Sequence, residues 1–223
     1  MKAVLLDSFG TLLRMDAPGP HLRRELAGLG VDLSVEEAAA AFRAEISYYL
    51  AHNLEGRDAE SLLDLRNRCA GVVREAIGRP DLDLDSVREA MLRSIRFSAF
   101  EDAPPALAEL RASGIRTVVA SNWDCSLPEA LERAGLRSLV DGVAASAVVG
   151  AAKPARELFL AALELAGAEP GDAVHVGDSF QKDVEGARAA GLSAVLLARD
   201  GSAPSAREVP VIRSLAELPA LLT

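Results

Sequence analysis

Short apolar runs alternate with helix-length segments along most of this 223-residue chain, and this rhythm restricts the folds open to it. The runs of strand length are 2–6, 116–120, 142–145, 173–176 and 194–197. They are apolar at nearly every position rather than at every second one, which is typical of strands buried on both faces. Such strands occur in parallel sheets with helices on both sides. We therefore predict an α/β fold with a doubly wound parallel sheet.

The segments between these runs carry apolar residues at helical spacing. They are residues 104–113, 126–134, 155–166 and 181–190. A glycine stands at or just beyond the end of each, at positions 114, 135, 167 and 191. Glycine is the residue most often found directly after a helix, so we predict that each of these helices ends there.

One long segment interrupts the alternation, because residues 16–97 show no strand pattern and are too long for a plain crossover connection. Within it, 36–51 and 58–77 have the apolar spacing of long helices. Ser34 with Glu37, and Ser86 with Glu89, have the spacing of a capping box at a helix start.

These features predict an all-helical cap domain over residues 16–97, inserted into a core domain formed by 1–15 and 98–223. The insertion leaves the sheet just after Asp7, at the carboxyl edge where open α/β sheets bind their ligands. A cap in this position can close over a site at that edge.

Charge and composition limit the partners and the location of the protein. A net charge of −9 argues against nucleic acid or an anionic membrane as a partner, since both attract a surplus of Lys and Arg. The first residues run straight into the predicted strand before Asp7, without the pattern expected of a secretory leader, and no run of about 20 apolar residues follows, so we expect a cytoplasmic protein.

Cys69 and Cys125 form no CxxC pair and are predicted to be reduced. His175 lies within an apolar run and is predicted to be a core residue with its hydrogen bonds satisfied.

Polar residues follow several of the predicted strands. Asp7 follows the first, Ser121 the second, Lys153 lies in a loop after the third, and Asp178 and Asp183 follow the fourth. Taken singly, each has a plain explanation as a turn residue, a helix cap or a solvated charge. Several carboxylates at one sheet edge repel one another, however, unless a cation or hydrogen bonds compensate them. The acidic residues therefore favour a metal site.

The order and spacing of these residues resemble those of the haloacid dehalogenase-like (HAD) hydrolase superfamily, along the whole chain. That family has a nucleophilic Asp in an Asp-x-x-Gly-Thr loop, a Ser or Thr ending the second strand, a Lys, and a Gly-Asp-x-x-x-x-Asp motif. The matching residues here are Asp7 with Gly10 and Thr11, then Ser121, Lys153, Asp178 and Asp183. The helical insertion looks like the C1 type of cap found in the family, on a HAD-like Rossmannoid core.

The resemblance implies a hydrolase in which Asp7 attacks a phosphorus or carbon atom and forms a covalent aspartyl intermediate. It implies that Lys153 and Ser121 stabilise the charge of the transferring group. It also implies Mg²⁺ as cofactor. The predicted metal residues are Asp7, the backbone carbonyl of Phe9 and Asp178, together with Asp183, which would orient water on the metal or bind it directly. We further predict that Gly10, Thr11, Asn122 and Trp123 orient a small phosphorylated or otherwise anionic substrate.

Position 9 departs from the family pattern, because most of its phosphatases carry a second Asp there and this chain has Phe9. Such an acid protonates the leaving alkoxide, a contribution of roughly 10²–10⁴ in rate. We therefore predict a Mg²⁺-dependent phosphoesterase whose activity is weakened, or is restricted to substrates with good leaving groups. One alternative is a haloacid dehalogenase, which carries an aromatic residue at this position and releases halide without protonation. Another is a catalytically silent binding protein of the same fold. Three carboxylates facing the single Lys153 favour metal dependence over dehalogenation.

Overall fold

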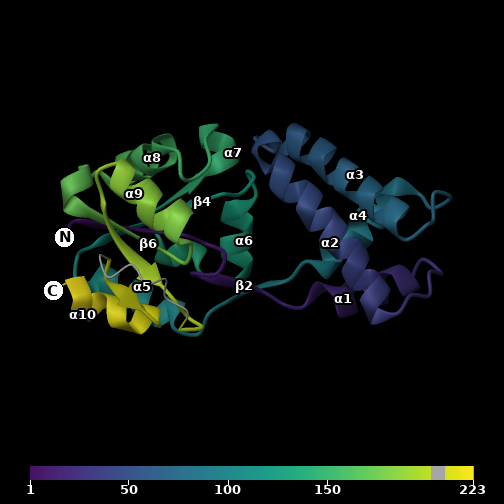
Figure 1. Ribbon diagram of the computed structural model, residues 1–223, viewed down its shortest axis with the longest axis horizontal. Helices are drawn as coiled ribbons and strands as arrows, with labels where there is room; N and C mark the ends of the chain where they lie inside the picture. Colours follow the sequence, from purple (N-terminus) through teal and green to yellow (C-terminus); the bar gives the residue numbers. More distant parts are fainter. Residues whose placement is uncertain (202–208, 223) are drawn as a thin grey trace. The chain divides into compact units, whose positions relative to one another are not determined.

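The computed structural model describes residues 1–201 and 209–222. The chain forms two compact units, one made of Met1–Arg14 with Ser98–Thr223 and the other of Met15–Phe97. We call the first the core unit and the second the inserted unit (Figure 1). Within the described ranges, none of the helices combines the length and hydrophobicity needed to cross a bilayer.

A six-stranded parallel sheet forms the centre of the core unit, with the strand order β5-β4-β1-β6-β7-β8. The strands are β1 (Ala3–Leu6), β4 (Arg116–Ser121), β5 (Gly142–Ala145), β6 (Ala173–Gly177), β7 (Ser193–Leu197) and β8 (Val211–Ile212). Helices α8 and α9 lie on one side of the sheet and α5 and α10 on the other (Figure 1). The predicted α/β class with a doubly wound parallel sheet is confirmed.

The helices of the core unit are α5 (Ala103–Ala112), α6 (Leu127–Arg133), α7 (Ser146–Val149), α8 (Arg156–Ala166), α9 (Gly186–Ala189) and α10 (Leu218–Leu222). Short 3₁₀ turns cover Arg137–Leu139, Pro170–Asp172 and Leu215–Glu217. All four glycines predicted to end a helix adopt a positive φ, between 62° and 89°, in agreement with that prediction.

The predicted helix over 181–190 requires a correction. A π-helical turn occupies Phe180–Glu185, and only Gly186–Ala189 is α-helical. The amides of Asp183 and Val184 both reach the carbonyl of Ser179, at 2.8 and 3.4 Å, so the first turn is wider than an α-helical one. Local propensity does not specify this widening, which accompanies the burial of the Asp183 side chain.

The inserted unit contains four α-helices, α1 (Pro18–Ala27), α2 (Val35–His52), α3 (Ala59–Ala76) and α4 (Leu84–Ser94), with a 3₁₀ turn at Asn53–Glu55. Their apolar faces enclose a shared core that includes Leu22, Phe42, Leu65, Val73 and Met91. The capping box of Ser34 and Glu37 is present as predicted. The second predicted box is wrong, because Asp83 caps α4 and accepts from the amide of Ser86 at 2.9 Å.

Two short strands were not predicted. β2 (Leu13–Met15) and β3 (Phe97–Ala99) pair as a separate two-stranded sheet at the points where the chain leaves and re-enters the core unit. The amide of Asp16 also donates to the carbonyl of Arg96 at 3.0 Å. Each strand has only three residues, and neither is fully buried, so neither has the apolar run that marks the strands of the main sheet.

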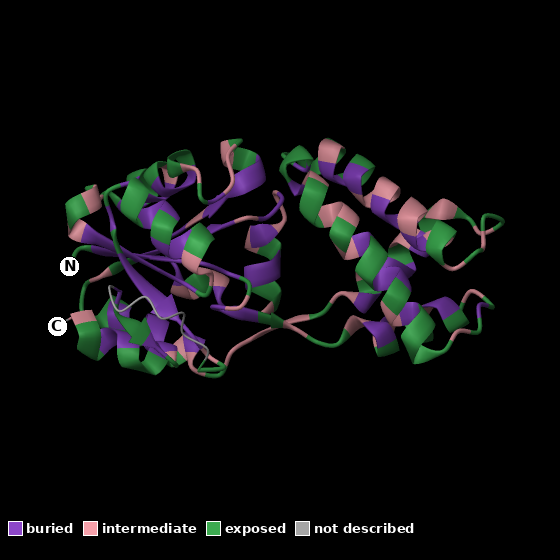
Figure 2. Ribbon diagram, viewed as in Figure 1, coloured by how far each residue is buried: buried purple, intermediate pink, exposed green. Residues whose placement is uncertain are grey.

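The main sheet is buried along its central strands, as the purple strands of Figure 2 show. All four residues of β1 are buried, and Leu6 lies opposite Val119 of β4 and Val176 of β6. Because these strands run parallel, their carboxyl ends lie together at one edge. Asp7, Ser121 and Asp178 are therefore brought to the same edge of the sheet.

Candidate active site

Asp7 follows β1 directly and is 6% exposed. Its amide donates to the carbonyl of Val176 at 2.9 Å, which continues the pairing with β6 by one residue. Its Oδ1 accepts from the Ser121 hydroxyl at 3.0 Å and from Lys153 Nζ at 2.5 Å. The structure thus brings together the three residues that the sequence predicts to be catalytic.

Lys153 is buried and bridges two carboxylates, because its Nζ also donates to Asp183 Oδ1 at 2.6 Å. The side chain of Asn122 holds the backbone of this lysine from two sides. Asn122 Nδ2 donates to the Lys153 carbonyl at 3.1 Å, and the Lys153 amide donates to Asn122 Oδ1 at 2.7 Å. Asn122, predicted to orient substrate, is seen here fixing Lys153.

The three acidic residues form a compact cluster. Carboxylate oxygens of Asp7, Asp178 and Asp183 all lie within 4.8 Å of one another. Glycine makes this approach possible, because a Cβ at Gly10 would lie 2.0 Å from Asp178 Oδ2 and one at Gly177 would lie 2.2 Å from Asp183 Cγ. Gly10 also has a φ of +86°, which side chains rarely adopt. The glycine of the Asp-x-x-Gly-Thr loop is therefore required on both counts.

His175 joins this cluster, and the prediction of a satisfied core histidine is only half right. The ring is buried, as predicted, and lies edge-on to Phe159 at 5.0 Å. Its Nε2 is 2.9 Å from Asp183 Oδ1, whereas Nδ1 has no hydrogen-bond partner among the described residues. The only sequence signal was an ionisable residue inside an apolar strand, two positions before the motif glycine.

The buried charges shift one another. Burial lowers the pKa of His175 and favours the neutral ring. Burial also acts against the charge of Lys153, but the attraction of Asp7 and Asp183 is stronger and raises the lysine pKa. Burial alone would raise the pKa of Asp183, yet Lys153 and His175 together lower it. Lys153 and Asp183 therefore form an ionised pair.

The other two carboxylates are less well compensated. Burial and the neighbouring Asp183 raise the pKa of Asp7 against the opposing effect of Lys153. The Asp178 residue is exposed overall, but its carboxyl is partly removed from water. This desolvation is the largest effect on its pKa, and together with repulsion from Asp7 and Asp183 it raises the pKa to about 6. Negative charge is thus in excess at Asp7 and Asp178, which is the electrostatic condition for binding a cation.

The remaining predicted residues differ in exposure. Phe9 is 49% exposed. Thr11 is fully buried, and its hydroxyl has no hydrogen-bond partner within the described ranges. Trp123 is also buried, and its amide donates to the Ser146 hydroxyl at 3.0 Å. Of these three side chains, only that of Phe9 offers a large accessible surface.

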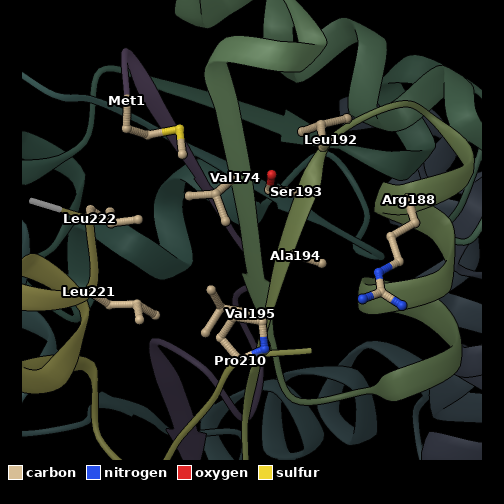
Figure 3. Close-up of a pocket in the computed structure, with 10 residues that line it drawn as sticks. All are labelled: Met1, Val174, Arg188, Leu192, Ser193, Ala194, Val195, Pro210, Leu221 and Leu222. Carbon is tan, nitrogen blue, oxygen red and sulfur yellow. The ribbon is translucent and has the colours of Figure 1, made fainter. Parts of the chain in front are cut away.

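A pocket at another place in the core unit is separate from this cluster. Figure 3 shows its lining, which comes from the N-terminus, β6, α9, β7, the residue before β8, and α10. It includes Met1, Leu192 and Ser193. These three residues lie at the amino ends of β1 and β7, whereas Asp7 and Asp178 follow the carboxyl ends of β1 and β6. The pocket does not share a residue with the acidic cluster.

Comparison with known proteins gives consistent matches. The model of a family described as haloacid dehalogenase-like hydrolase matches residues 1–191. Phosphoserine phosphatase of Thermus thermophilus is 34% identical over 225 residues, which cover 89% of each chain. A HAD phosphatase structure from Thermococcus onnurineus is 29% identical, with a TM-score of 0.67 over 100% of this chain and 98% of that one. A 2-haloacid dehalogenase structure from Pseudomonas syringae has a TM-score of 0.71 over the same shares, but at 24% identity it shows the fold alone.

Proposed function

The chain belongs to the haloacid dehalogenase-like hydrolases and is phosphatase-like, and from that premise we propose a Mg²⁺-dependent phosphoesterase that acts through an aspartyl-phosphate on Asp7. One observation carries the proposal. Oxygens of Asp7, Asp178 and Asp183 lie within 4.8 Å of one another, and the single lysine among them is already bonded to two of the three. A further positive charge is needed to balance them.

The residues fit a hard cation. Carboxylate and carbonyl oxygens are the ligands that Mg²⁺ prefers, and Gly10 leaves the space that the Asp178 carboxylate occupies. Asp7, the Phe9 carbonyl and Asp178 would hold the ion, with Asp183 supporting them. When bound, it would neutralise charge on the phosphoryl oxygens. Asp183 already accepts from Lys153, His175 and the Ser179 amide, so its part is to hold other groups in place.

The residues of the chain then divide the work. The Asp7 carboxylate attacks phosphorus, a new O–P bond forms, and the bond from phosphorus to the leaving oxygen breaks. The Ser121 hydroxyl and Lys153 ammonium, both bonded to Asp7 Oδ1, orient the nucleophile beforehand. Lys153 also stabilises charge on the transferring group, and Asn122 and Asp183 keep it in place. Water then hydrolyses the acyl phosphate and regenerates Asp7.

Phe9 sets the limit of this chemistry, because an aromatic side chain cannot protonate a leaving alkoxide. We therefore propose a restriction to small phosphorylated substrates whose leaving group departs unprotonated, such as aryl or acyl phosphates. Loss of a general acid costs roughly 10²–10⁴ in rate on ordinary alkyl phosphates.

The inserted unit serves, in this proposal, as the cap of the enzyme. The predicted division is a cap over 16–97 and a core of 1–15 with 98–223. The insertion leaves through β2, just after the Asp7 loop, and returns through β3, which pairs with β2. The Phe100 amide also donates to the Leu12 carbonyl at 3.0 Å, so both connections lie beside the loop that follows the carboxyl end of β1. Ligands of open α/β sheets bind at that edge.

Phe9 also favours a second candidate, dehalogenation of a small haloacid, because halide needs no proton to leave. The acidic cluster argues against it. Without a cation, the pKa of Asp7 is raised by burial and by Asp183, which weakens a carboxylate nucleophile. A catalytically silent binding protein is the third possibility, and kinetics separates all three.

The test is hydrolysis of p-nitrophenyl phosphate and acetyl phosphate with and without Mg²⁺, beside an Asp7→Asn control. We expect hydrolysis that requires Mg²⁺ and disappears in the control. Chloride release from 2-chloropropionate without Mg²⁺ would instead support the dehalogenase. If none of the three compounds reacts faster than with the control, the enzyme proposal fails.

The variant Phe9→Asp sharpens the test, because it restores a carboxyl group where the family usually has one. We expect turnover of alkyl phosphates to rise by about 10-fold or more, towards the range of a general acid, with a much smaller gain on acetyl phosphate. Steady-state rates on both substrate classes measure this difference. Equal gains on both would contradict the argument from the leaving group.

A further inference from the structure

Arg199, which follows β7, binds the backbone of the loop that carries the proposed nucleophile. One terminal nitrogen of its guanidinium donates to the Thr11 carbonyl at 2.7 Å, and Nε donates to the Gly10 carbonyl at 3.2 Å. The Gly10 carbonyl lies three residues beyond Asp7 and 189 positions from Arg199 in sequence. The Thr11 carbonyl lies four residues beyond Asp7 and 188 positions from Arg199. The sequence gives no indication of this contact.

Asp102 and Phe100 hold the guanidinium in place. Asp102 accepts from both terminal nitrogens, at 2.9 and 3.0 Å, and the Phe100 ring centroid is 3.8 Å from the guanidinium carbon. The arginine and aspartate side chains are only 21% and 16% exposed, so this pair is screened less than a surface salt bridge. Partial burial acts to raise the pKa of the Asp102 carboxyl. The hydrogen bonds from Arg199, Ser214 and Leu215, with the charge of Arg199, outweigh burial and lower this pKa.

Asp102 occupies the position before α5 but makes no capping bond to that helix. Its Oδ2 instead accepts from the Ser214 hydroxyl at 2.7 Å and from the Leu215 amide at 2.8 Å. The carboxylate is therefore held by two donors from the segment that follows β8, and it links this segment to Arg199.

The loop after Asp7 is a tight turn, and Arg199 binds two of its backbone carbonyls. Ser8 O accepts from the amides of Leu12 and Leu13 at 2.8 Å, which closes the turn internally. The carbonyls of Gly10 and Thr11 are held by Arg199. Gly10 lies so close to Asp178 that a Cβ would be 2.0 Å from the carboxylate oxygen. A displacement of Gly10 would therefore alter the spacing between the loop and Asp178.

We propose that Arg199 is a positioning residue, which acts through the Gly10 and Thr11 carbonyls to hold the loop after Asp7 in register with Asp178. The effect on turnover rests on the proposed function, whereas the effect on the loop does not. A planar guanidinium suits this task, because four of its N–H groups serve two carbonyls and one carboxylate simultaneously. An ammonium group cannot reproduce this geometry.

The variants Arg199→Gln and Arg199→Lys test the proposal, with Arg116→Gln as matched control. Arg116 pairs with Asp141 at 3.7 Å in the same unit, and it stands at the amino end of β4, whereas the loop follows the carboxyl end of β1. Three quantities are measured for each variant. They are hydrogen exchange of the amides of residues 8–13, calorimetric Mg²⁺ affinity, and kcat and KM on p-nitrophenyl phosphate.

We expect Arg199→Gln to speed exchange of the loop amides by about 10-fold or more while strand β4 stays protected. Mg²⁺ affinity should fall, and kcat should fall by about 10-fold to 100-fold with KM changed less than about 3-fold, since misplacement affects chemistry more than binding. Arg199→Lys should lie between wild type and Arg199→Gln, and Arg116→Gln should match wild type.

The proposal is overturned if loop exchange in Arg199→Gln equals that in Arg116→Gln, or if all core amides exchange faster together. The latter result would indicate a merely stabilising ion pair. Loss of kcat with an equal rise in KM would also contradict positioning. If wild type hydrolyses neither p-nitrophenyl phosphate nor acetyl phosphate, the proposed function has failed, and loop exchange alone decides whether Arg199 holds the loop.

Discussion

The two units of the chain bury ionisable groups in opposite ways. In the core unit, Asp7, Lys153, Asp183 and His175 are all buried, and each is bonded to at least one of the others. In the inserted unit, Glu45 of α2 is 3% exposed, and its Oε2 has no hydrogen-bond partner among the described residues. Burial raises the pKa of Glu45 to about 7, and a hydrogen bond with Cys69 opposes this only in part.

This difference shows that burial of a charge does not by itself indicate a catalytic site. The core network joins residues 146 and 30 positions apart and compensates most of its charges, as a site with a defined geometry requires. Among the described residues, no charged group contributes to the shift of the Glu45 pKa, so the neutral form of Glu45 costs less free energy to bury than the charged form. Buried charges that are paired with opposite charges from distant segments of the chain are therefore the better indication of a functional site.

Removing the compensating charge should have the largest effect. We expect Lys153→Met to lose about 3–5 kcal/mol in free energy of unfolding, because Asp7 and Asp183 would remain buried without their cation, and to abolish phosphatase activity. Urea denaturation measures the loss. The exposed Lys182 supplies the control, since Lys182→Met should change stability by less than about 0.5 kcal/mol. Equal effects of the two substitutions would show that the network is not essential to the core.

The uncompensated carboxyl of the inserted unit should give a pH effect of similar size. The pKa of Glu45 is raised on folding from 4.5 to about 7, so its contribution is fully present below pH 4.5 and is lost as pH rises through about 7. We expect wild type to lose about 3 kcal/mol relative to Glu45→Gln over this interval and then to level off. Urea titrations of both proteins between pH 4.5 and 8.5 give this difference. Parallel stability curves would mean that Glu45 does not titrate as proposed.

The smallest change in stability is expected for a substitution at Asp178. Its response to Mg²⁺ can be compared with that of a substitution at Glu45 in the inserted unit. Asp178→Asn should stabilise the metal-free protein by about 1 kcal/mol, after allowance for solvent screening, because it relieves repulsion with Asp7 and Asp183. It should also remove the rise in Tm that Mg²⁺ gives to wild type. Thermal denaturation without Mg²⁺ and at a saturating Mg²⁺ concentration measures both. A destabilised variant that still responds to Mg²⁺ would contradict the proposed metal site, whereas Glu45→Gln should respond as wild type does.

Sequence patterns specified most of the core unit. Five strands of the parallel sheet, three of the four helices predicted between them and the glycines that end the helices follow from apolar spacing and local turn preferences. The patterns failed where local preference is weak. The paired strands β2 and β3 have only three residues each, and the wide turn at Phe180–Glu185 looks like any helix start in sequence.

The candidate site divides in the same way. Asp7, Ser121, Lys153, Asp178 and Asp183 could be placed together from the sequence, because parallel strands bring their carboxyl ends to one edge. The partners of these residues could not. Neither the Asn122 clamp on Lys153 nor the bond from His175 to Asp183 leaves a periodic signal in the sequence.

The sequence by itself therefore determined which residues reach the catalytic edge, because strand direction and hydrophobic spacing are local properties that add up along the chain. Only the tertiary structure decided how those residues are held. Arg199 and Gly10 are 189 positions apart in sequence and meet through a hydrogen bond from the guanidinium to the Gly10 carbonyl. Such contacts are fixed when distant segments pack against one another, so no single stretch of sequence encodes them.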